Sequence, residues 1–342
     1  MILEKIKFVI IGSGFVGKRH AAIIQQNPEA ELVAFCDIAP KESLGLEAFE
    51  AIPFFCSIDE LLISGLDFDV ACICSPNGLH AAHALKILNH KKHVVVEKPM
   101  GLTKTQCEQI IYKSLHVSRH VFGVMQNRYS PPSVWMKEVV DKKLLGDIYM
   151  VQINCYWNRD DRYYLPNNEP HPWKGKQSLD GGTLFTQFSH FIDIMYWLFG
   201  DISNVQAKFA NFSHENTIEF EDSGVVSFDF VNGGMGSLNY STAVYETNLE
   251  SSLTVIGSKG SVRIGGQYMN KVRYCRIEDY QMPELAPSNP ANDYGSYKGS
   301  AANHVYVIEN VIDVLKGRKA ISTNALEGLK VVEIIEKIYA LK

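Results

Sequence analysis

Three glycines near the start of the chain place the strongest constraint on its fold. A mostly apolar run, Ile6 to Ile11, leads into Gly12-Ser-Gly14-Phe-Val-Gly17. Gly12 permits a tight turn from strand to helix, Gly14 lets the backbone approach a pyrophosphate, and Gly17 allows the helix to pack closely on the strand. The spacing therefore predicts a βαβ unit that binds a dinucleotide.

The residues around this motif indicate which dinucleotide is bound. Phe15 and Val16 open the predicted helix, whose first backbone amides point at the phosphates. Asp37 lies twenty residues after Gly17, at the end of a second apolar run. A carboxylate there accepts hydrogen bonds from the ribose hydroxyls and repels a 2′-phosphate, which predicts NAD and not NADP. The alternative is a glycine-rich turn that binds no ligand.

Length and composition fit a globular protein of about two domains. The chain has 342 residues, 46% of them apolar, and a net charge of −5 without a block of like charge, so neither nucleic acid nor a membrane is expected as a partner. No secretory leader or membrane-span pattern is found, which predicts a cytoplasmic protein. The seven cysteines lie mostly in apolar runs and are expected to be buried thiols. Cys72 and Cys74 lack a second pair to complete a zinc site, so no metal is predicted.

Residues 1–122 alternate between strand-like and helical patterns. This alternation predicts a parallel, doubly wound sheet, an α/β Rossmann domain that binds NAD. The expected strands are Lys7–Ile11, Glu31–Cys36, Val70–Cys74, His93–Val96 and His120–Val124, and the expected helices are Phe15–Gln26, Leu79–Asn89 and Lys104–Leu115.

Residues 123–342 predict an α+β domain for substrate binding and oligomerisation, with a large, mostly antiparallel open sheet. The strands, expected to be antiparallel neighbours, are 148–157, 203–212, 223–231, 234–244, 251–257 and 261–264, and the helices are 185–199, 303–316 and 325–341. Residues 281–300, rich in Pro, Asn and Gly, predict a long irregular segment. An exposed apolar sheet face has to be covered, which predicts a homodimer or homotetramer.

Polar residues follow two strands of the first domain, where ligands bind in open α/β sheets. One segment is Ser75-Pro-Asn77-Gly-Leu-His80 and the other is Glu97-Lys98-Pro99, and both are expected at the cofactor. A lysine held next to a cationic nicotinamide should have a lowered pKa and could act as an acid or a base. The alternative is a solvated lysine before a turn proline.

The glycine turn and the two segments above are followed in the chain by a predicted helix that comes after Gly181-Gly182 and carries His190. In this order, the motifs resemble those of the Gfo/Idh/MocA oxidoreductase family. The resemblance covers the whole chain and implies that Lys98 and His190 are catalytic residues around the substrate hydroxyl and the nicotinamide. Without it, His190 would be read as a satisfied core histidine. Many members carry an acidic residue or asparagine one helical turn before the histidine, where this chain has Thr186, which carries no charge.

A finer resemblance is to the UDP-N-acetyl-2-amino-2-deoxy-D-glucuronate 3-dehydrogenases of bacterial O-antigen and lipopolysaccharide synthesis. The segments that carry it are 146–154, 156–159, 163–164, 173–175, 179–182 and 248–254. It implies NAD-dependent oxidation of the 3-hydroxyl of a UDP-2-acetamido-2-deoxyglucuronate to the 3-keto sugar. The alternatives are a related dehydrogenase for a free polyol or sugar such as inositol, and a non-catalytic sugar or NAD sensor, against which the intact Lys98 and His190 argue.

The same resemblance places the sugar at the face of the open sheet. Gln126 and Trp173 are expected to contact the cofactor, and the residues expected at the substrate are Lys98, Asn127, Arg128, Arg159, Tyr164, Thr186, Gln187 and His190. Arg128 either pairs with a substrate carboxylate or phosphate or forms a structural ion pair. Packing is the favoured role for each aromatic residue, namely Trp157, Tyr163, Tyr164 and Trp173. Lys174 and Lys176 are expected to be solvated; the alternative is that they are phosphate ligands.

Overall fold

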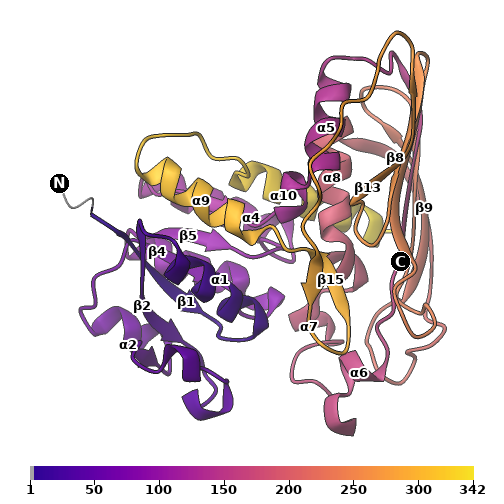
Figure 1. Cartoon of the computed structure of the whole chain (residues 1–342). Helices are drawn as coiled ribbons and strands as arrows, with labels where there is room; N and C mark the ends of the chain where they lie inside the picture. Colours follow the sequence, from indigo (N-terminus) through magenta and orange to yellow (C-terminus); the bar gives the residue numbers. More distant parts are fainter. Residues whose placement is uncertain (1–3) are drawn as a thin grey trace. The chain divides into compact units, whose positions relative to one another are not determined.

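The computed structural model describes residues 4–342, which form two compact units (Figure 1). The first contains the chain up to Met125 together with His304–Val332, and the second contains Gln126–Asn303 and Glu333–Lys342. The division predicted after residue 122 is contiguous, whereas in the structure the segment from His304 returns to the first unit. It does so because helix α9 (His304–Leu315) packs against α1 (Phe15–Gln26), and Lys316 pairs with Glu29 at 2.7 Å.

The first unit is built on a six-stranded parallel sheet in the order β3-β2-β1-β4-β5-β6. Its strands are β1 (Ile6–Ile11), β2 (Ala30–Cys36), β3 (Phe54–Phe55), β4 (Val70–Ile73), β5 (His93–Val96) and β6 (Val121–Gly123). Its other helices are α2 (Ile58–Ile63), α3 (His80–Asn89) and α4 (Lys104–His116), with short 3₁₀ turns η1 (Lys41–Ser43), η2 (Glu47–Phe49) and η3 (Asn77–Leu79). The predicted doubly wound sheet is confirmed.

This topology brings the candidate residues of the first unit to one edge of the sheet. Parallel strands that run side by side end at the same edge, and the strand order reverses direction at β1 and β4, where ligands bind in such sheets. Gly12 directly follows β1, Asp37 follows β2, and Glu97 follows β5. The strands themselves are buried on both faces, as a sheet covered by helices requires.

The second unit is built on a seven-stranded sheet in the order β13-β12-β11-β7-β10-β9-β8. Its strands are β7 (Ile148–Tyr156), β8 (Ile202–Ala210), β9 (Ser223–Phe230), β10 (Met235–Ser241), β11 (Glu250–Gly257), β12 (Gly260–Gly265) and β13 (Lys271–Ile277). The predicted open, mostly antiparallel sheet is confirmed, with one correction: β7 and β10 are parallel neighbours. The long connection that carries the chain through α8 (Ser189–Phe199) allows this, because parallel neighbours need a crossover.

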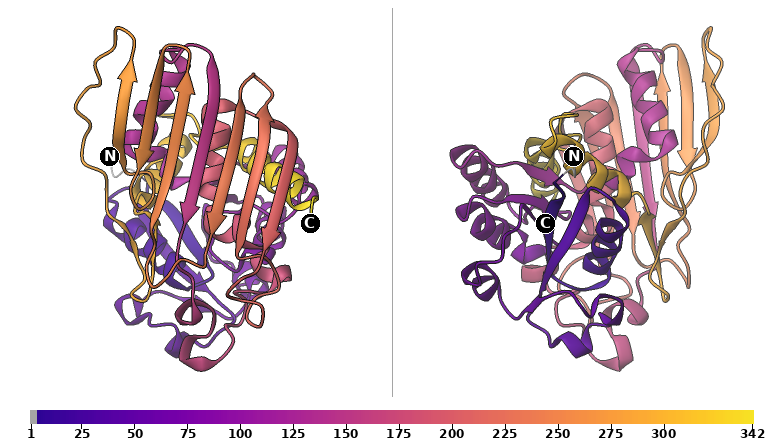
Figure 2. Two further views of the ribbon diagram at one scale, coloured as in Figure 1. Left: turned by 90° about the vertical axis from the view of Figure 1, so that its right-hand side faces the viewer. Right: turned by 60° about the vertical axis from the view of Figure 1, so that its left-hand side comes forward.

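Helices cover one face of this second sheet, and the other face carries no helix (Figure 2). Trp157, just after β7, packs edge-on against Phe188 and Phe191, and Phe199 contacts Phe230 of β9. The helical and turn segments of the unit are η4 (Gln126–Tyr129), α5 (Pro131–Asp141), α6 (Asp161–Tyr164), η5 (Pro166–Asn168), α7 (Gln177–Asp180) and η6 (Leu184–Phe188); α10 (Ala325–Tyr339) begins in the first unit and ends in this one.

The structure departs from the sequence-based elements in three places. The segment predicted to be a helix over 185–199 begins with a π-helical turn, η6, before α8 starts. The segment 281–300 is not wholly irregular, because β14 (Ala291–Asp293) pairs with β15 (Lys298–Ala301) as a short antiparallel hairpin. The sequence analysis did not predict β3, α2, α5 and β13. β3 and α2 are too short to show a repeat of apolar residues, and β13 is an edge strand with several charged residues.

Two further predictions concern the cysteines and membrane-spanning helices. Cys36, Cys72, Cys107 and Cys155 are buried as expected, but Cys56 is exposed, and none of the seven cysteines forms a disulfide. Within residues 4–342, no helix combines the length and the apolar character that crossing a bilayer demands.

Candidate active site

The glycine turn has the close contacts that the sequence motif predicts. Gly12 has φ +92°, and a Cβ there would lie 2.5 Å from the Ser75 nitrogen. A Cβ at Gly17 would lie 2.0 Å from the Gly12 carbonyl oxygen, so helix α1 could not approach β1 with any larger residue. By contrast, no atom lies within 4 Å of a Cβ built at Gly14, which leaves this side of the turn open. No side chain caps α1, so its first amides fit a bound pyrophosphate.

Asp37 connects the end of β2 to this turn. Its carboxylate accepts hydrogen bonds from the Ser13 amide at 2.6 Å and from the Ala39 amide at 3.0 Å. The side chain is half-buried, so a face of the carboxylate stays accessible. The geometry fits the predicted contact with a ribose, because a carboxylate beside the glycine turn accepts from hydroxyls and repels a phosphate.

The segments after β4 and β5 lie side by side and are held together by His80. The two ring nitrogens of this buried histidine lie 2.7 Å from the carbonyl oxygens of Pro99 and Ser75. Burial lowers the pKa of His80. Ser75 itself contacts His83 Nδ1 through its hydroxyl at 2.9 Å, and Asn77 is buried in η3. His80 therefore braces the turn, and its direct contact with the cofactor stays a prediction.

Glu97 is buried at the end of β5 and is held by two histidines. Its Oε1 lies 2.8 Å from His20 Nε2 on α1 and 3.5 Å from His304 Nε2 at the start of α9. Its Oε2 accepts a hydrogen bond from the Lys98 amide at 3.2 Å. Burial alone would raise the pKa of Glu97, but the hydrogen bonds from the two histidines outweigh it and hold the pKa well below its usual range.

In the second unit, His190 stands on α8 opposite Gln126 of η4. The Gln126 amide nitrogen lies 3.0 Å from His190 Nε2, and both side chains are buried. When the amide donates, Nε2 carries a lone pair, which is the form that a general base needs. The neighbouring Asn127 is also buried and accepts from the Ser300 hydroxyl at 2.6 Å.

Arg128 forms a buried ion pair with Asp193, one turn beyond His190 on the same helix. Its Nε donates to Asp193 Oδ2 at 2.8 Å and its Nη2 to Oδ1 at 2.5 Å, a bidentate arrangement. The guanidinium also lies 5.2 Å from the centroid of the Trp197 ring. The structure thus has the structural ion pair, one of the two roles considered for Arg128. A contact between Arg128 and the substrate remains a prediction.

The hydrogen-bond acceptors of the buried Arg159 are all neutral. With 1% of its surface exposed, it donates to Gln187 Oε1 at 2.7 Å and to the carbonyl oxygen of Lys298 at 3.1 Å. Its remaining acceptors are the carbonyl oxygen of Asn158 and the side chain of Asn248, and within residues 4–342 it makes no ion pair with a carboxylate. Burial lowers the pKa of Arg159, since nothing opposite in charge compensates it.

Lys174 is a second cation at the same place. Its Nζ lies 3.9 Å from the centroid of the Tyr163 ring, and Arg159 Cζ lies 5.4 Å from that centroid. Burial, followed by the charge of Arg159, lowers the pKa of Lys174 to about 8. The expectation that Lys174 is solvated is wrong, because this side chain is half-buried, whereas Lys176 is exposed as expected.

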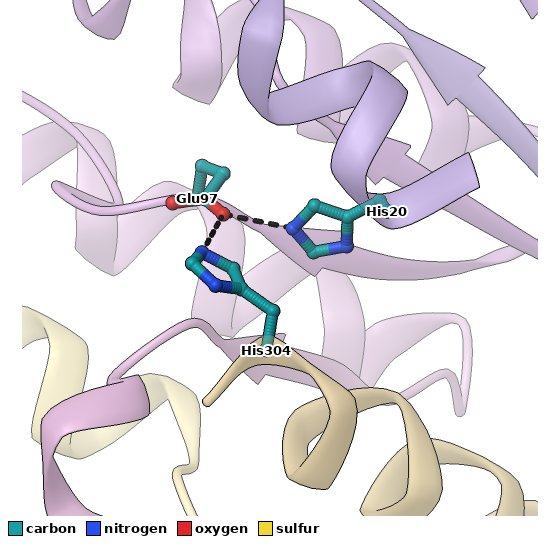
Figure 3. A group of neighbouring side chains, drawn as sticks. All are labelled: His20, Glu97 and His304. Carbon is teal, nitrogen blue, oxygen red and sulfur yellow. Dashed lines mark hydrogen bonds and ion pairs between the residues drawn. The ribbon is translucent and has the colours of Figure 1, made fainter. Parts of the chain in front are cut away.

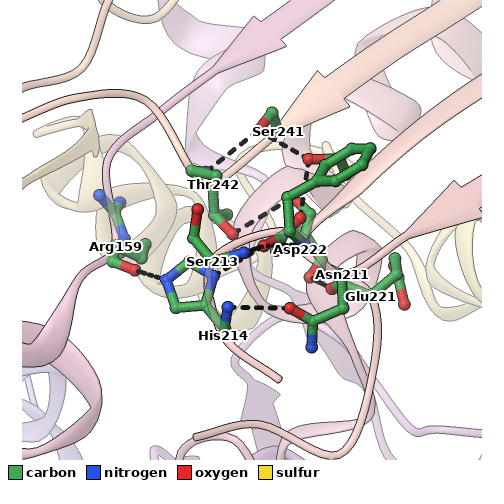
Figure 4. Close-up of polar contacts among 12 residues, drawn as sticks. Arg159, Asn211, Ser213, His214, Glu221, Asp222, Ser241 and Thr242 are labelled. Atoms are coloured by element: carbon green, nitrogen blue, oxygen red, sulfur yellow. Dashed lines mark hydrogen bonds and ion pairs between the residues drawn. The ribbon is translucent and has the colours of Figure 1, made fainter. Parts of the chain in front are cut away.

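A buried network fixes the backbone at Arg159 (Figure 4). His214 lies with Nε2 2.6 Å from the Arg159 carbonyl oxygen and Nδ1 3.0 Å from Asp222 Oδ2. Asp222 also accepts from the amides of Phe212 and Ser213. The two ring nitrogens of His214 thus contact oxygen atoms on opposite sides, which fixes the orientation of the ring. The Asp222 carboxylate is thereby committed to His214 and does not compensate Arg159.

The remaining predicted residues have structural partners. The Thr186 hydroxyl donates to Asp180, and the π turn η6 removes the one-turn spacing from His190 that an uninterrupted α-helix would give. Gln187 donates to the Tyr163 hydroxyl at 2.9 Å, and Tyr164 packs with Ile218 and Phe220. Trp173 is half-buried and contacts His171 edge-on. Packing is thus confirmed for Tyr163, Tyr164 and Trp157.

Sequence reasoning missed several residues of these networks. His20 follows the glycine turn by three residues, and His304 opens a helix that was predicted, so both were visible as polar residues at apolar positions. Asp193 stands at i+3 from His190, a spacing that could have suggested a partner for Arg128. No sequence signal connects His214 with Arg159, because 55 residues separate them.

Comparisons with known proteins agree with this architecture. Residues 6–119 match the oxidoreductase family with an NAD-binding Rossmann fold, and residues 134–263 match the GFO/IDH/MocA C-terminal domain. The WlbA dehydrogenase from Bordetella pertussis, solved with NADH and UDP-GlcNAcA, is similar at 31% identity and a TM-score of 0.88, covering 99% of this chain and 96% of that one. The WlbA dehydrogenase from Chromobacterium violaceum, solved with the same two ligands, is similar at 29% identity and a TM-score of 0.87. The match covers 99% of this chain and 94% of that one.

A curated relative with another substrate is also similar. Inositol 2-dehydrogenase of Salmonella typhimurium is 27% identical over 201 residues, which are 57% of this chain and 55% of that protein. The family match over the first unit confirms the predicted cofactor, NAD.

The position of Asp37 predicts the choice of cofactor. Wild-type protein should bind NAD more tightly than NADP. Asp37→Asn should narrow the difference in Kd between the two cofactors, because it removes the negative charge. The asparagine still offers an acceptor for the Ser13 amide. Calorimetric titration with both cofactors measures this. A wild-type preference for NADP would show that the end of β2 has been misinterpreted.

Proposed function

Because the chain belongs to the Gfo/Idh/MocA oxidoreductase family, we propose that it is an NAD-dependent dehydrogenase that oxidises the 3-hydroxyl of a UDP-2-acetamido-2-deoxyglucuronate to the 3-keto sugar. The similarity at 31% identity to an enzyme solved with NADH and UDP-GlcNAcA supports this substrate. The observation that carries the proposal lies in this chain itself: a buried arginine without a counter-charge, next to a half-buried lysine.

Arg159 and Lys174 together form a positive site: Arg159 has no carboxylate partner in the described part of the chain, and the charge of Asp180 acts on the pKa of Lys174 less strongly than burial and the charge of Arg159 do. A buried charge that has only neutral partners costs several kcal/mol, and proteins normally pair it. The four acceptors of Arg159 are two carbonyl oxygens and two amide oxygens, and Lys174 lies over a tyrosine ring. A carboxylate or diphosphate of the ligand supplies the missing negative charge. Since Arg159 is enclosed, it acts through its charge, and Lys174 is the group that contacts the anion.

Lys98 and His190 are proposed as the acid–base pair of the reaction. NAD, when bound by the glycine turn, α1 and Asp37, supplies the hydride acceptor. The proton of the 3-hydroxyl passes to Lys98 or to His190. Gln126 supports the role of His190, because its amide nitrogen lies 3.0 Å from Nε2 and fixes the orientation of the ring. Glu97 supports the role of Lys98, because it fixes the backbone amide of this lysine.

The cellular context follows from the substrate class. We propose that the protein acts in the cytoplasm in the synthesis of bacterial surface polysaccharide, as a homodimer or homotetramer. The helix-free face of the second sheet supports oligomerisation, since Met150 of β7 pairs with Met235 of β10 on one side and Ile256 of β11 on the other. All three side chains are exposed and form an apolar row across three strands.

Turnover of matched substrates tests the proposed activity. With NAD, UDP-2-acetamido-2-deoxyglucuronate should be oxidised with a kcat/KM at least about 100-fold above that of UDP-N-acetylglucosamine, which lacks only the carboxylate and leaves a cation unpaired. The absorbance of the reduced cofactor reports the rate. Equal turnover of the two sugars would exclude the uronate. Preference for free inositol would indicate a polyol dehydrogenase, and NAD binding without any turnover would indicate a sensor.

The proposed acid–base roles predict a loss of turnover without a loss of cofactor. Lys98→Ala and His190→Ala should each lower kcat by about 10²–10⁴-fold, the usual contribution of a general acid or base, while the Kd for NAD changes little. His90→Ala, at an exposed position after α3, serves as the matched control. A His190 variant with near-normal kcat and a lowered melting temperature would identify this histidine as a core residue.

Lys174 predicts a pH dependence of substrate binding. Its pKa of about 8 means that it is a cation at pH 7 and mostly neutral at pH 9. The Kd for UDP-2-acetamido-2-deoxyglucuronate should therefore rise roughly tenfold between these pH values, as one proton is required for tight binding. In Lys174→Arg the charge persists, so this rise should disappear. Calorimetry at both pH values measures these dissociation constants. If the Kd of Lys174→Arg rises as much as that of the wild type, the titrating group is not Lys174.

A further inference from the structure

The carboxylate of Glu97 joins three segments of the first unit. His20 reaches it from α1 and His304 reaches it from the start of α9, and their Nε2 atoms converge on the same oxygen (Figure 3). The three side chains are 0%, 2% and 6% exposed for His20, His304 and Glu97. Both imidazoles approach Oε1, His20 at 2.8 Å and His304 at 3.5 Å, which leaves Oε2 for another donor.

That other donor is the backbone of Lys98. Its amide donates to Glu97 Oε2 at 3.2 Å, and the Glu97 amide donates to the Ile73 carbonyl at 3.0 Å. On the far side of the lysine, the Pro99 carbonyl lies 2.7 Å from His80 Nδ1. Lys98 therefore stands between two anchored residues, and each anchor is a buried polar contact from a neighbouring element.

We propose that His20 and His304 are positioning residues for Lys98. They hold the Glu97 carboxylate in one rotamer, the carboxylate fixes the Lys98 amide, and the direction of the lysine side chain follows. The proposal rests on the proposed function, since it requires Lys98 to take part in the reaction. His20 lies five residues after Phe15 on α1, so the helix that receives the cofactor also sets the position of the lysine.

The same three side chains form a possible metal-ligand set, since one ligand atom of each lies within 4.8 Å of the others. Two features favour direct hydrogen bonding among these side chains over metal binding. His20 Nε2 and Glu97 Oε1 are 2.8 Å apart, the length of a direct charge-assisted hydrogen bond. Histidines that ligate metals nearly always donate their second nitrogen to an acceptor, whereas Nδ1 of His20 and of His304 has no hydrogen-bond partner within residues 4–342.

Paired substitutions of the two histidines test the proposal. His20→Met and His304→Met remove the donors and should lower kcat with UDP-2-acetamido-2-deoxyglucuronate by roughly 10- to 100-fold, the cost of misplacing a reacting group by about 1 Å. The Kd for NAD should change less than about threefold. His20→Gln and His304→Gln can still donate from the position of Nε2 and should restore most of kcat. The exposed His90→Met is the matched control.

A double-mutant cycle separates positioning from stability. In a Lys98→Ala background, His20→Met and His304→Met should cost no further turnover, because their effect passes through the missing lysine. Losses that add to that of Lys98→Ala would overturn the proposal. If Lys98→Ala alone keeps its turnover, the proposed role of Lys98 fails, and the next measurement still decides whether the histidines fix this segment.

Hydrogen exchange provides a readout that does not depend on activity. The Lys98 amide should exchange faster in His20→Met and His304→Met than in wild type and in the glutamine variants, because its acceptor Oε2 is no longer held. Unchanged exchange in both methionine variants would overturn the proposal. So would one equivalent of zinc in the purified protein, removed by a chelator and absent from both methionine variants, since the side chains would then be metal ligands.

Discussion

The burial of charge constrains both candidate sites, because a charge taken out of water has to be compensated inside the protein. In the first unit the buried Glu97 carboxylate accepts from two histidines and one backbone amide. In the second unit the buried Arg128 is matched by Asp193. Removing one partner of either group would leave a buried charge exposed to an apolar surrounding. The first arrangement therefore fixes the segment that carries Lys98, and the second fixes the helix that carries His190.

Arg159 is the exception to this pattern, and its surroundings explain why the exception persists. Asp222, a buried carboxylate of the network in Figure 4, contacts His214 and accepts from two backbone amides. The oxygens of Asp222 thus have partners other than Arg159. The protein holds the arginine with carbonyl and amide oxygens, which fix its geometry without cancelling its charge. Such a group favours an anionic ligand more strongly than a paired arginine could, and it fits an otherwise acidic protein.

The sequence predicts the scaffold of the first unit well, because its signals are local. The glycine spacing, the apolar strands and Asp37 each lie within one βαβ unit, and the structure has these elements at nearly the predicted bounds. The parallel pairing of β7 with β10 was not predictable in this way, since it depends on a crossover through α8. The same holds for Arg159, whose partners Gln187 and Lys298 lie 28 and 139 residues away. Residue type suggested a ligand contact there, but only packing reveals the missing counter-charge.

The π turn η6 shows how a local irregularity changes an argument from spacing. In an uninterrupted α-helix, residues 186 and 190 would lie on one face, one turn apart. The wider turn over Leu184–Phe188 breaks that relation, and Thr186 donates to Asp180. Gln187 instead faces Arg159 and Tyr163. The irregularity thus lets consecutive residues serve different partners just before His190. π turns persist mainly where function requires them, which agrees with this position in the chain.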